Sequence, residues 1–238
     1  LQVQILIMDL NLFFTPVDEA LFEDITSVSA FVKSININTS KIPELKGHDI
    51  ALIGITESRA SDVNKGVAKA ADEIRKKLYN LKRGSGSYKI VDLGNLNNGV
   101  DLDETYGRLK EVGEYLVGHN ILPVIIGGTH DISLGQFYSY EGLDKLVSVL
   151  NVDAFLDLDE EGPANASHLH KMLVHEPNFL FNYSHLAYQT YLIESSSIEV
   201  LDRLYFETYR VGMLRQVMEE MEPVVREADM VSFDISAI

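Results

Sequence analysis

The apolar positions along the chain predict buried strands that alternate with amphipathic helices. Continuous apolar runs bounded by polar or glycine residues, typical of buried strands, occur at residues 48–56, 88–94, 121–128 and 146–157. Helical spacing follows the first two runs, at residues 61–82 and 102–120. Strands that alternate with helices favour parallel pairing and right-handed crossovers. We therefore predict an α/β fold, a three-layer α/β/α sandwich with a mainly parallel sheet.

Each of these two helices carries a candidate core face. In the first, that face consists of Ala68, Ile74, Leu78 and Leu81. In the second, it consists of Leu109, Val112, Leu116 and Val117. The pattern weakens later in the chain, where we expect strands at 184–193, 204–212 and 229–238 and helices at 197–204 and 213–228. Pro223 lies inside the last helix and predicts a kink or a restart there.

The domain organisation is predicted from the regularity of this pattern. Residues 1–47 are less regular, and we expect an N-terminal extension that packs on a domain formed by residues 48–238. The first ten residues are apolar but lack a basic region and reach Asp9 early, which favours a strand or core segment over a signal peptide. We predict a cytoplasmic protein whose domain continues beyond Ile238.

Composition narrows the classes of function. The chain has 20 basic and 36 acidic residues, a net charge of −16, which disfavours nucleic acid and anionic membranes as partners. No apolar run approaches the length needed to span a bilayer. The chain has no cysteine, so disulfides, thiolate ligands and cysteine nucleophiles are excluded. Oxygen and imidazole groups would hold any metal, which leaves Mn²⁺, Mg²⁺, Fe²⁺ and Zn²⁺ open.

Metal-binding residue types follow three of the predicted strands. His130 comes after the strand that ends in two glycines, Asp153 and Asp157 follow the next, and Asp234 follows the last. Ligands of α/β sheets bind beyond the carboxyl ends of the strands, so this pattern indicates a metal site. Simpler roles stay open: His130 can cap a turn or helix, and the acids can start helices, form turns or pair with lysine.

These residues resemble the motifs of the ureohydrolase family, which includes arginase, agmatinase, guanidinobutyrase and formiminoglutamase. The family motifs G-G-D-H-S, D-A-H-x-D and S-x-D-x-D have counterparts, in the same order, in GGTHD at 127–131, DAFLD at 153–157 and SFDIS at 232–236. The resemblance covers residues 48–238. It implies an arginase-like sandwich with paired manganese ions, and a hydrolase of linear guanidino or formimino C–N bonds. In that chemistry, metal-activated hydroxide attacks the amidine carbon.

The resemblance also implies the metal ligands. One Mn²⁺ site is complete in sequence, with His130, Asp153, Asp157 and Asp234 as its ligands. The second site is doubtful, because two of its ligand positions are occupied by Phe155 and Ser236. Phenylalanine cannot coordinate a metal, and serine is a poor neutral ligand.

Further roles come from the same resemblance. Asp157 and His170 are the expected catalytic residues, since Asp157 can hold the nucleophile and move a proton to the leaving nitrogen. Asp159 and His168 are expected to bind the substrate. The implied partners are a small guanidino or formimino substrate and further copies of the chain in a homo-oligomer. His168, His170 and His175 could alternatively form a separate metal site.

Two other classes of function stay open. Phe155 and Ser236 motivate the first, a catalytically impaired relative that acts as a binding or assembly module. The second is a nucleotide-binding doubly wound domain, which shares the alternating pattern. The chain lacks the G-x-G-x-x-G and P-loop motifs of that class, and it has no G-x-S-x-G motif of a serine hydrolase.

Overall fold

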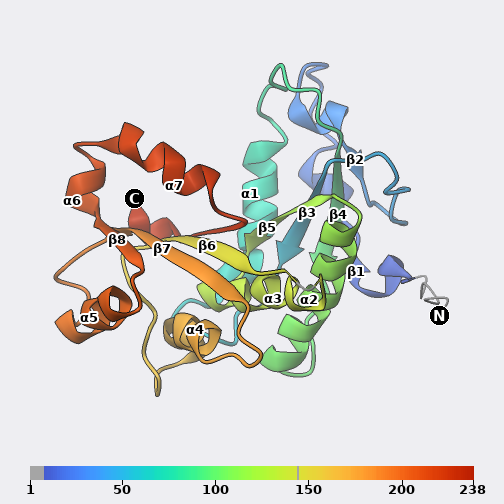
Figure 1. The fold of residues 1–238 in the computed structure, drawn as a ribbon. Helices are drawn as coiled ribbons and strands as arrows, with labels where there is room; N and C mark the ends of the chain where they lie inside the picture. The colour runs from blue at the N-terminus through green and yellow to red at the C-terminus, as the bar shows by residue number, and fades with distance from the viewer. Residues whose placement is uncertain (1–7, 144) are drawn as a thin grey trace. The chain divides into compact units, whose positions relative to one another are not determined.

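A computed structural model describes residues 8–143 and 145–238 (Figure 1). The chain divides into two compact units, Leu1–Thr129 and His130–Ile238. The predicted division at residue 48 is a different one and stays a prediction. Of the predicted N-terminal apolar segment, residues 1–7 lie outside the described residues. The short 3-10 helix η1 (Leu10–Leu12) follows them, with Asp9 accepting a hydrogen bond from the backbone of Asn11.

The first unit contains a sheet with the strand order β1-β4-β3-β5. Its central strands are β3 (Ile50–Ile55), β4 (Ile90–Leu96) and β5 (Leu122–Gly127), and they pair in parallel. The short strand β2 (Asn36–Ile37) also pairs in parallel with β4, whereas β1 (Phe14–Thr15) pairs with it antiparallel. The strands predicted at 48–56, 88–94 and 121–128 are confirmed. The apolar runs of β3 and β4 fill buried positions of this sheet, whereas β5 leaves Leu122 and Val124 exposed.

Two helices of the first unit test the predicted core faces. Helix α2 (Leu102–Gly118) begins where Asp101 accepts a hydrogen bond from the Glu104 N–H, and it buries Leu109, Val112 and Leu116 as predicted. Helix α1 (Ala70–Leu78) follows the 3-10 helix η4 (Lys65–Lys69).

The predicted face of α1 is wrong in part, since Ala68 and Leu78 are half-buried. Ile74 and Leu81 are exposed, and the helix buries Ala71 and Arg75 instead. A charged residue takes the buried position because Arg75 forms an ion pair with the buried Asp92 of β4, with 2.8 Å between Nη2 and Oδ1.

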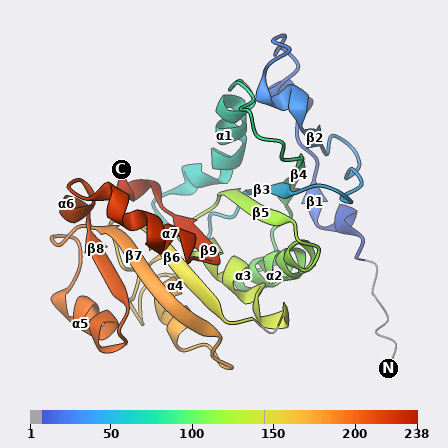
Figure 2. The same ribbon diagram turned by 45° about the horizontal axis from the view of Figure 1, so that its top comes forward.

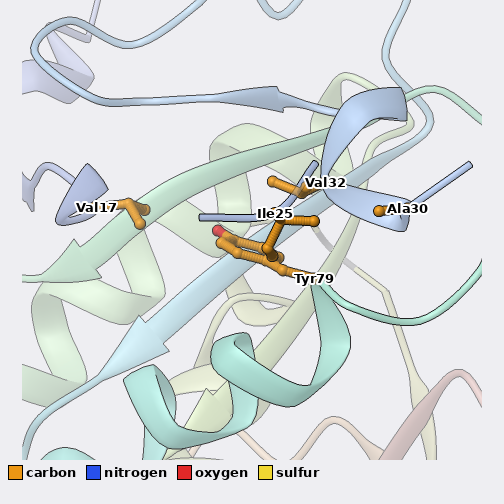
Figure 3. Close-up of a cluster of buried hydrophobic side chains, with 5 residues drawn as sticks. All are labelled: Val17, Ile25, Ala30, Val32 and Tyr79. Carbon is orange, nitrogen blue, oxygen red and sulfur yellow. The ribbon is translucent and has the colours of Figure 1, made fainter. Parts of the chain in front are cut away.

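Residues before β3 pack on the end of α1. The 3-10 helices η2 (Glu19–Leu21) and η3 (Phe31–Ser34) flank a cluster of buried side chains, shown in Figure 3, that contains Val17, Ile25, Ala30, Val32 and Tyr79. The Tyr79 hydroxyl donates a hydrogen bond of 2.7 Å to Oδ2 of Asp92. The N-terminal segment is therefore anchored to the same acid that binds Arg75.

The second unit contains a parallel sheet with the strand order β8-β7-β6-β9 (Figure 2). Its strands are β6 (Val147–Val152), β7 (Leu180–Tyr188), β8 (Glu207–Arg210) and β9 (Met230–Phe233). Helices α4 (Ala164–Leu173) and α5 (Ser195–Arg203) cover one face of this sheet, and α6 (Val211–Leu214) and α7 (Glu222–Arg226) lie over the other. Leu150, Leu186, Ala187, Leu214 and Met221 form a core cluster in this unit. The unit therefore has the three layers that the sequence predicts.

Several predicted elements of the second unit differ in detail. The strand predicted at 184–193 begins earlier, at Leu180, and the helix predicted at 213–228 consists of α6, the 3-10 helix η7 (Met218–Met221) and α7. Pro223 lies in the first turn of α7, which confirms the predicted restart. Helices α3 (Ser133–Tyr138) and α4 were not predicted, since both are short and α4 has a polar, histidine-containing sequence.

The described strands pair mainly in parallel, in an α/β fold, but their hydrogen bonds form two sheets and not one. Among the described residues, no helix is both long enough and apolar enough to cross a membrane.

Candidate metal centre

The backbone conformation at the end of β5 explains why two glycines occur there. Gly127 and Gly128 have φ values of 79° and 77°, in the left-handed region that favours glycine. A Cβ atom on Gly127 would lie 2.8 Å from both the Ala71 nitrogen and the Ile55 oxygen. The chain therefore needs glycine to turn out of β5, and His130 begins the 3-10 helix η5 (His130–Ile132) three residues after Gly127.

Two of the predicted ligands follow the carboxyl ends of neighbouring strands in the second sheet. Strands β6 and β9 are parallel neighbours, with Val152 opposite Phe233. The next residue in each chain segment is an aspartate, Asp153 after β6 and Asp234 after β9. The Asp234 N–H donates a hydrogen bond of 2.9 Å to the Val152 carbonyl, which keeps the two strand ends together.

The ring of His130 lies at the centre of the predicted ligands. Its Nδ1 atom is 2.6 Å from Oδ2 of Asp153, 3.3 Å from Oδ2 of Asp157 and 3.9 Å from Oδ2 of Asp234. Its Nε2 atom is 2.6 Å from the Ser232 hydroxyl oxygen. The structure thus brings His130, Asp153, Asp157 and Asp234 together within the second unit.

The backbone of Asp157 is strained in a way that suits a site residue. Its φ is 51°, a left-handed conformation that non-glycine residues adopt rarely and that aspartate tolerates better than most. Such conformations cluster at functional sites, where the surrounding structure holds them in place. Here the Asp157 carbonyl accepts a hydrogen bond of 3.2 Å from the Leu169 N–H of α4. Helix α4 therefore helps to fix the turn that aims this carboxylate.

Burial and mutual charge set the protonation of the cluster. Burial raises the pKa of Asp157, and the charge of Asp153 adds to this, although His130 opposes it. Burial also acts to raise the pKa of Asp153, but hydrogen bonds from His130, the Phe155 N–H and Ser236 outweigh it and lower that pKa. The pKa of His130 rises despite burial, because both carboxylates contact its ring. A protonated His130 imidazole would offset only part of the negative charge of these carboxylates.

The two histidines of α4 lie on different faces of the helix. His168 is buried, and its Nδ1 atom is 3.6 Å from Oδ2 of Asp157. Its ring centroid is 4.5 Å from that of His130. Burial lowers the pKa of His168 well below its usual range, and the nearby His130 adds to this. His170 follows two residues later, about 200° further around the helix, and is half-buried.

The structure therefore brings His168 to the carboxylates, and His170 faces another direction. The catalytic role of His170 stays a prediction. Residues 168 and 170 would share a side only in a strand, and both lie in α4.

A pocket of about 450 Å³ lies beside the cluster and is lined in part by Asp157. Three further acidic residues line it, Asp159, Glu160 and Glu194. Asp159 is exposed, and its Oδ1 atom accepts a hydrogen bond of 3.1 Å from the Glu161 N–H. Asp157 belongs to both the cluster and the pocket, so a molecule in the pocket would lie next to the buried acids. The predicted substrate-binding roles of Asp159 and His168 stay predictions.

Two buried polar residues of β7, Tyr183 and His185, form hydrogen bonds that lead to the backbone of Asp153, and the sequence pattern did not predict them. His185 of β7 is fully buried, and its Nε2 atom lies 3.0 Å from the Asp153 carbonyl oxygen. The Tyr183 hydroxyl lies 2.9 Å from its Nδ1 atom. The carbonyl can only accept, so Nε2 carries the proton and the hydroxyl donates to Nδ1. Tyr183 and His185 stand two residues apart on one face of a strand, a spacing that could have signalled a pair.

The donor set fits a divalent metal ion. His130, Asp153 and Asp234 offer ligand atoms within 4.8 Å of one another, and so do His130, Asp157 and His168. Carboxylate oxygen and imidazole nitrogen suit Mn²⁺, Fe²⁺, Co²⁺ and Zn²⁺. Buried carboxylates that converge repel one another, and a divalent ion would relieve this repulsion.

Acids and histidine at the strand ends of a parallel α/β sheet define a candidate metal centre of the ureohydrolase type. Solved structures share the fold. Formimidoylglutamase from Bacillus subtilis has a TM-score of 0.68 at 22% identity, over 79% of this chain and 66% of that one. Formiminoglutamase from Trypanosoma cruzi, solved with Mn²⁺, has a TM-score of 0.67 at 18% identity, over 77% and 68% of the two chains.

The chain belongs to the arginase family, whose model matches residues 48–238. Among curated proteins, formimidoylglutamase from Hahella chejuensis is 33% identical over 134 residues, covering 50% of this chain and 40% of the relative. Formimidoylglutamase from Geobacillus sp. (strain WCH70) is 29% identical over 127 residues, covering 50% and 39%. The matches thus span about two fifths of these relatives' length.

Proposed function

We propose that the protein is a metal-dependent hydrolase of linear C–N bonds in a guanidino or formimino compound. The observation that carries this proposal is the convergence of His130, Asp153, Asp157 and Asp234 at one site of a chain that belongs to the arginase family. The curated relatives named above are formimidoylglutamases, which favours a formimino substrate. Mn²⁺ is the cofactor we propose, since a solved relative contains it.

The roles of the residues follow from their positions. A bound divalent ion lowers the pKa of water and so supplies a nucleophile at neutral pH. Asp157 lines the pocket and also lies in the cluster, 3.3 Å from His130 Nδ1. It is placed to orient the attacking water and to transfer a proton to the leaving nitrogen. His130, Asp153 and Asp234 would hold the ion, and Ser232 would orient the His130 ring through Nε2.

The pocket favours a small cationic group. Its volume of about 450 Å³ lies within the usual range for small-molecule sites. Carboxylates bind planar amidinium and guanidinium groups through charge-assisted hydrogen bonds, often two at a time. Asp159 is the exposed acid that we assign to this contact. The substrate's reacting carbon would then lie beside Asp157.

The test is turnover by the purified protein loaded with Mn²⁺. A panel of guanidino and formimino compounds is incubated with the protein, and release of urea, ammonia or formamide is measured. We expect one compound to react and Asp157→Asn to abolish product. Asp62→Asn, at an exposed acid of the first unit, is the matched control and should leave the rate unchanged. Absence of product from every compound, together with absence of binding, would overturn the proposal.

A second candidate is a binding or assembly module without catalysis. Phe155, at the position where the family motif has histidine, is 42% exposed. Ser236, where the family motif has aspartate, donates a hydrogen bond to Asp153. Turnover at an ordinary enzymatic rate by the unmodified protein would exclude this candidate. A cytoplasmic location and a homo-oligomeric state remain predictions of the sequence.

A further inference from the structure

We propose that His168 is a metal ligand, so that His130, His168 and Asp157 give the centre two imidazoles and a carboxylate. This deepens the proposed function, because it concerns the same centre. It also accounts for Phe155: the imidazole that the second motif lacks is supplied from helix α4. The sequence-based role of His168 in substrate binding would then give way to metal binding.

The contact between His168 and Asp157 leaves a buried nitrogen without a partner, and a bound cation would provide one. The Nδ1 atom of His168 has no hydrogen-bond partner among the described residues, and the residue is only 2% exposed. Oδ2 of Asp157 lies 3.6 Å away, which is too long for a hydrogen bond. A buried polar atom without a partner destabilises the folded state. A metal ion between the two atoms would satisfy both.

The backbone holds these two side chains in place. The Leu169 N–H donates to the Asp157 carbonyl at 3.2 Å, and the Asp159 N–H donates to the Ala166 carbonyl at 3.0 Å. These two hydrogen bonds join helix α4 to the loop that contains Asp157. They lie on either side of His168 in the helix and on either side of Leu158 in the loop. The backbone therefore fixes the positions of His168 and Asp157 relative to each other.

The position of His130 completes the set. Its Nδ1 atom is 3.3 Å from the same Asp157 oxygen that faces His168, and the ligand atoms of all three residues lie within 4.8 Å of one another. One oxygen of Asp157 therefore lies close to two imidazole nitrogens. Packing two imidazoles around a carboxylate is the arrangement of several zinc and iron sites.

A second imidazole changes the expected metal preference. Imidazole ligands suit Zn²⁺, Co²⁺ and Fe²⁺, whereas sets dominated by carboxylates suit Mn²⁺ and Mg²⁺. Loss of His168 should therefore weaken Zn²⁺ and Co²⁺ binding more than Mn²⁺ binding. A residue that only packs beneath the site would weaken all of them alike.

The experiment compares His168→Gln with His170→Gln in the full chain. Both substitutions remove an imidazole from α4, but residue 170 faces another side of the helix. Affinities for ZnCl₂, CoCl₂ and MnCl₂ are measured by isothermal titration calorimetry, and circular dichroism checks folding. We expect His168→Gln to weaken Zn²⁺ binding by more than about 100-fold, since loss of an outer-shell partner alone costs about 10–100-fold. His170→Gln should bind like the wild type.

A measurement on the unmodified protein covers the case in which His168→Gln does not fold. Pulsed electron paramagnetic resonance of the Mn²⁺-loaded, ¹⁵N-histidine-labelled protein counts the imidazole nitrogens bound to the metal. Two nitrogens support the inference and one overturns it. A centre with one nitrogen that still turns over substrate would leave the proposed function intact. A protein that binds none of the three metals would overturn both.

Discussion

The Ser236 hydroxyl donates a hydrogen bond to Oδ1 of Asp153 across 2.6 Å. The Ser236 N–H donates in turn to Oδ1 of Asp234 at 2.8 Å. Ser236 therefore links the two strand-end acids as a neutral donor, at a position where the family motif has a second aspartate. The side chain that would have added a negative charge instead stabilises one that is already present. The hydrogen bonds from Ser236 therefore stabilise the carboxylates of Asp153 and Asp234, in a site with fewer candidate metal ligands than the family motif has.

The first prediction restores the two missing ligands. We expect the double variant Phe155→His and Ser236→Asp to bind one more metal ion per chain than the wild type, measured by plasma mass spectrometry after loading with Mn²⁺. Without metal, it should unfold at lower urea concentration, because a donor to Asp153 is replaced by a like charge at a cost of about 1–3 kcal/mol.

The control for this variant is Phe181→His with Ser195→Asp, at exposed positions of the same unit. It should bind the same number of ions as the wild type. An unchanged ion count in the double variant would show that positions 155 and 236 do not correspond to the missing ligands.

The second prediction concerns the buried ion pair of the first unit. The Arg75 guanidinium donates to both oxygens of Asp92, at 2.9 and 2.8 Å, and both side chains are fully buried. Arg75→Met leaves the Asp92 charge buried without its partner, so we expect a loss of about 3–5 kcal/mol in the free energy of unfolding.

Urea denaturation measures that loss, with Lys76→Met as the control. Lys76 is the next residue of α1 and pairs with Glu73 at the surface, so its loss should cost less than about 1 kcal/mol. Equal effects of the two substitutions would show that the buried pair contributes no more than an exposed one.

The central strands were predictable because continuous apolar runs have few alternatives to burial in a sheet. The metal-binding acids were predictable in position for the same reason, since Asp153 and Asp234 directly follow such runs. The buried face of α1 was not predictable, because the burial of Arg75 depends on Asp92, a residue of a separate strand. Periodicity treats an arginine as a surface residue, and only tertiary pairing reverses this.

The supporting residues of the centre were unpredictable for a related reason. Ser236 and His185 act through hydrogen bonds to Asp153 that exist only once β6, β7 and β9 are aligned. Helix α4 is short and polar, so its pattern did not distinguish it from a strand or a loop. This error hid the difference between His168 and His170, which depends on helical geometry.

The third prediction concerns acid stability. Burial acts to raise the pKa of Glu57, but hydrogen bonds from Arg59 and Thr105 outweigh it and lower that pKa from 4.5 to about 2. A carboxyl group with a lowered pKa in the folded state stabilises the fold above its ordinary pKa. That contribution is lost as the pH falls from 4.5 through about 2.

The measurement compares the free energy of unfolding of wild type and Glu57→Gln between pH 6 and pH 2. We expect the variant to be less stable by about 2 kcal/mol at pH 6, as is usual for hydrogen bonds to charged groups. The difference should shrink as the pH falls through that window. Glu23→Gln, at an exposed glutamate, should show no such convergence. A difference that does not change with pH would mean that the Glu57 charge is not the source of the stability.

The fourth prediction tests the support behind Asp153. The Tyr183 hydroxyl donates to His185 Nδ1, and His185 Nε2 donates to the Asp153 carbonyl. Tyr183→Phe leaves a buried ring nitrogen without its donor, so the free energy of unfolding should fall by about 1–3 kcal/mol. Because the His185 ring then loses its fixed orientation, Zn²⁺ affinity should fall about tenfold. Tyr191→Phe, at an exposed tyrosine, should change neither quantity. If stability falls while calorimetry finds unchanged Zn²⁺ affinity, Tyr183 supports the packing of β7 alone and does not position the metal ligand.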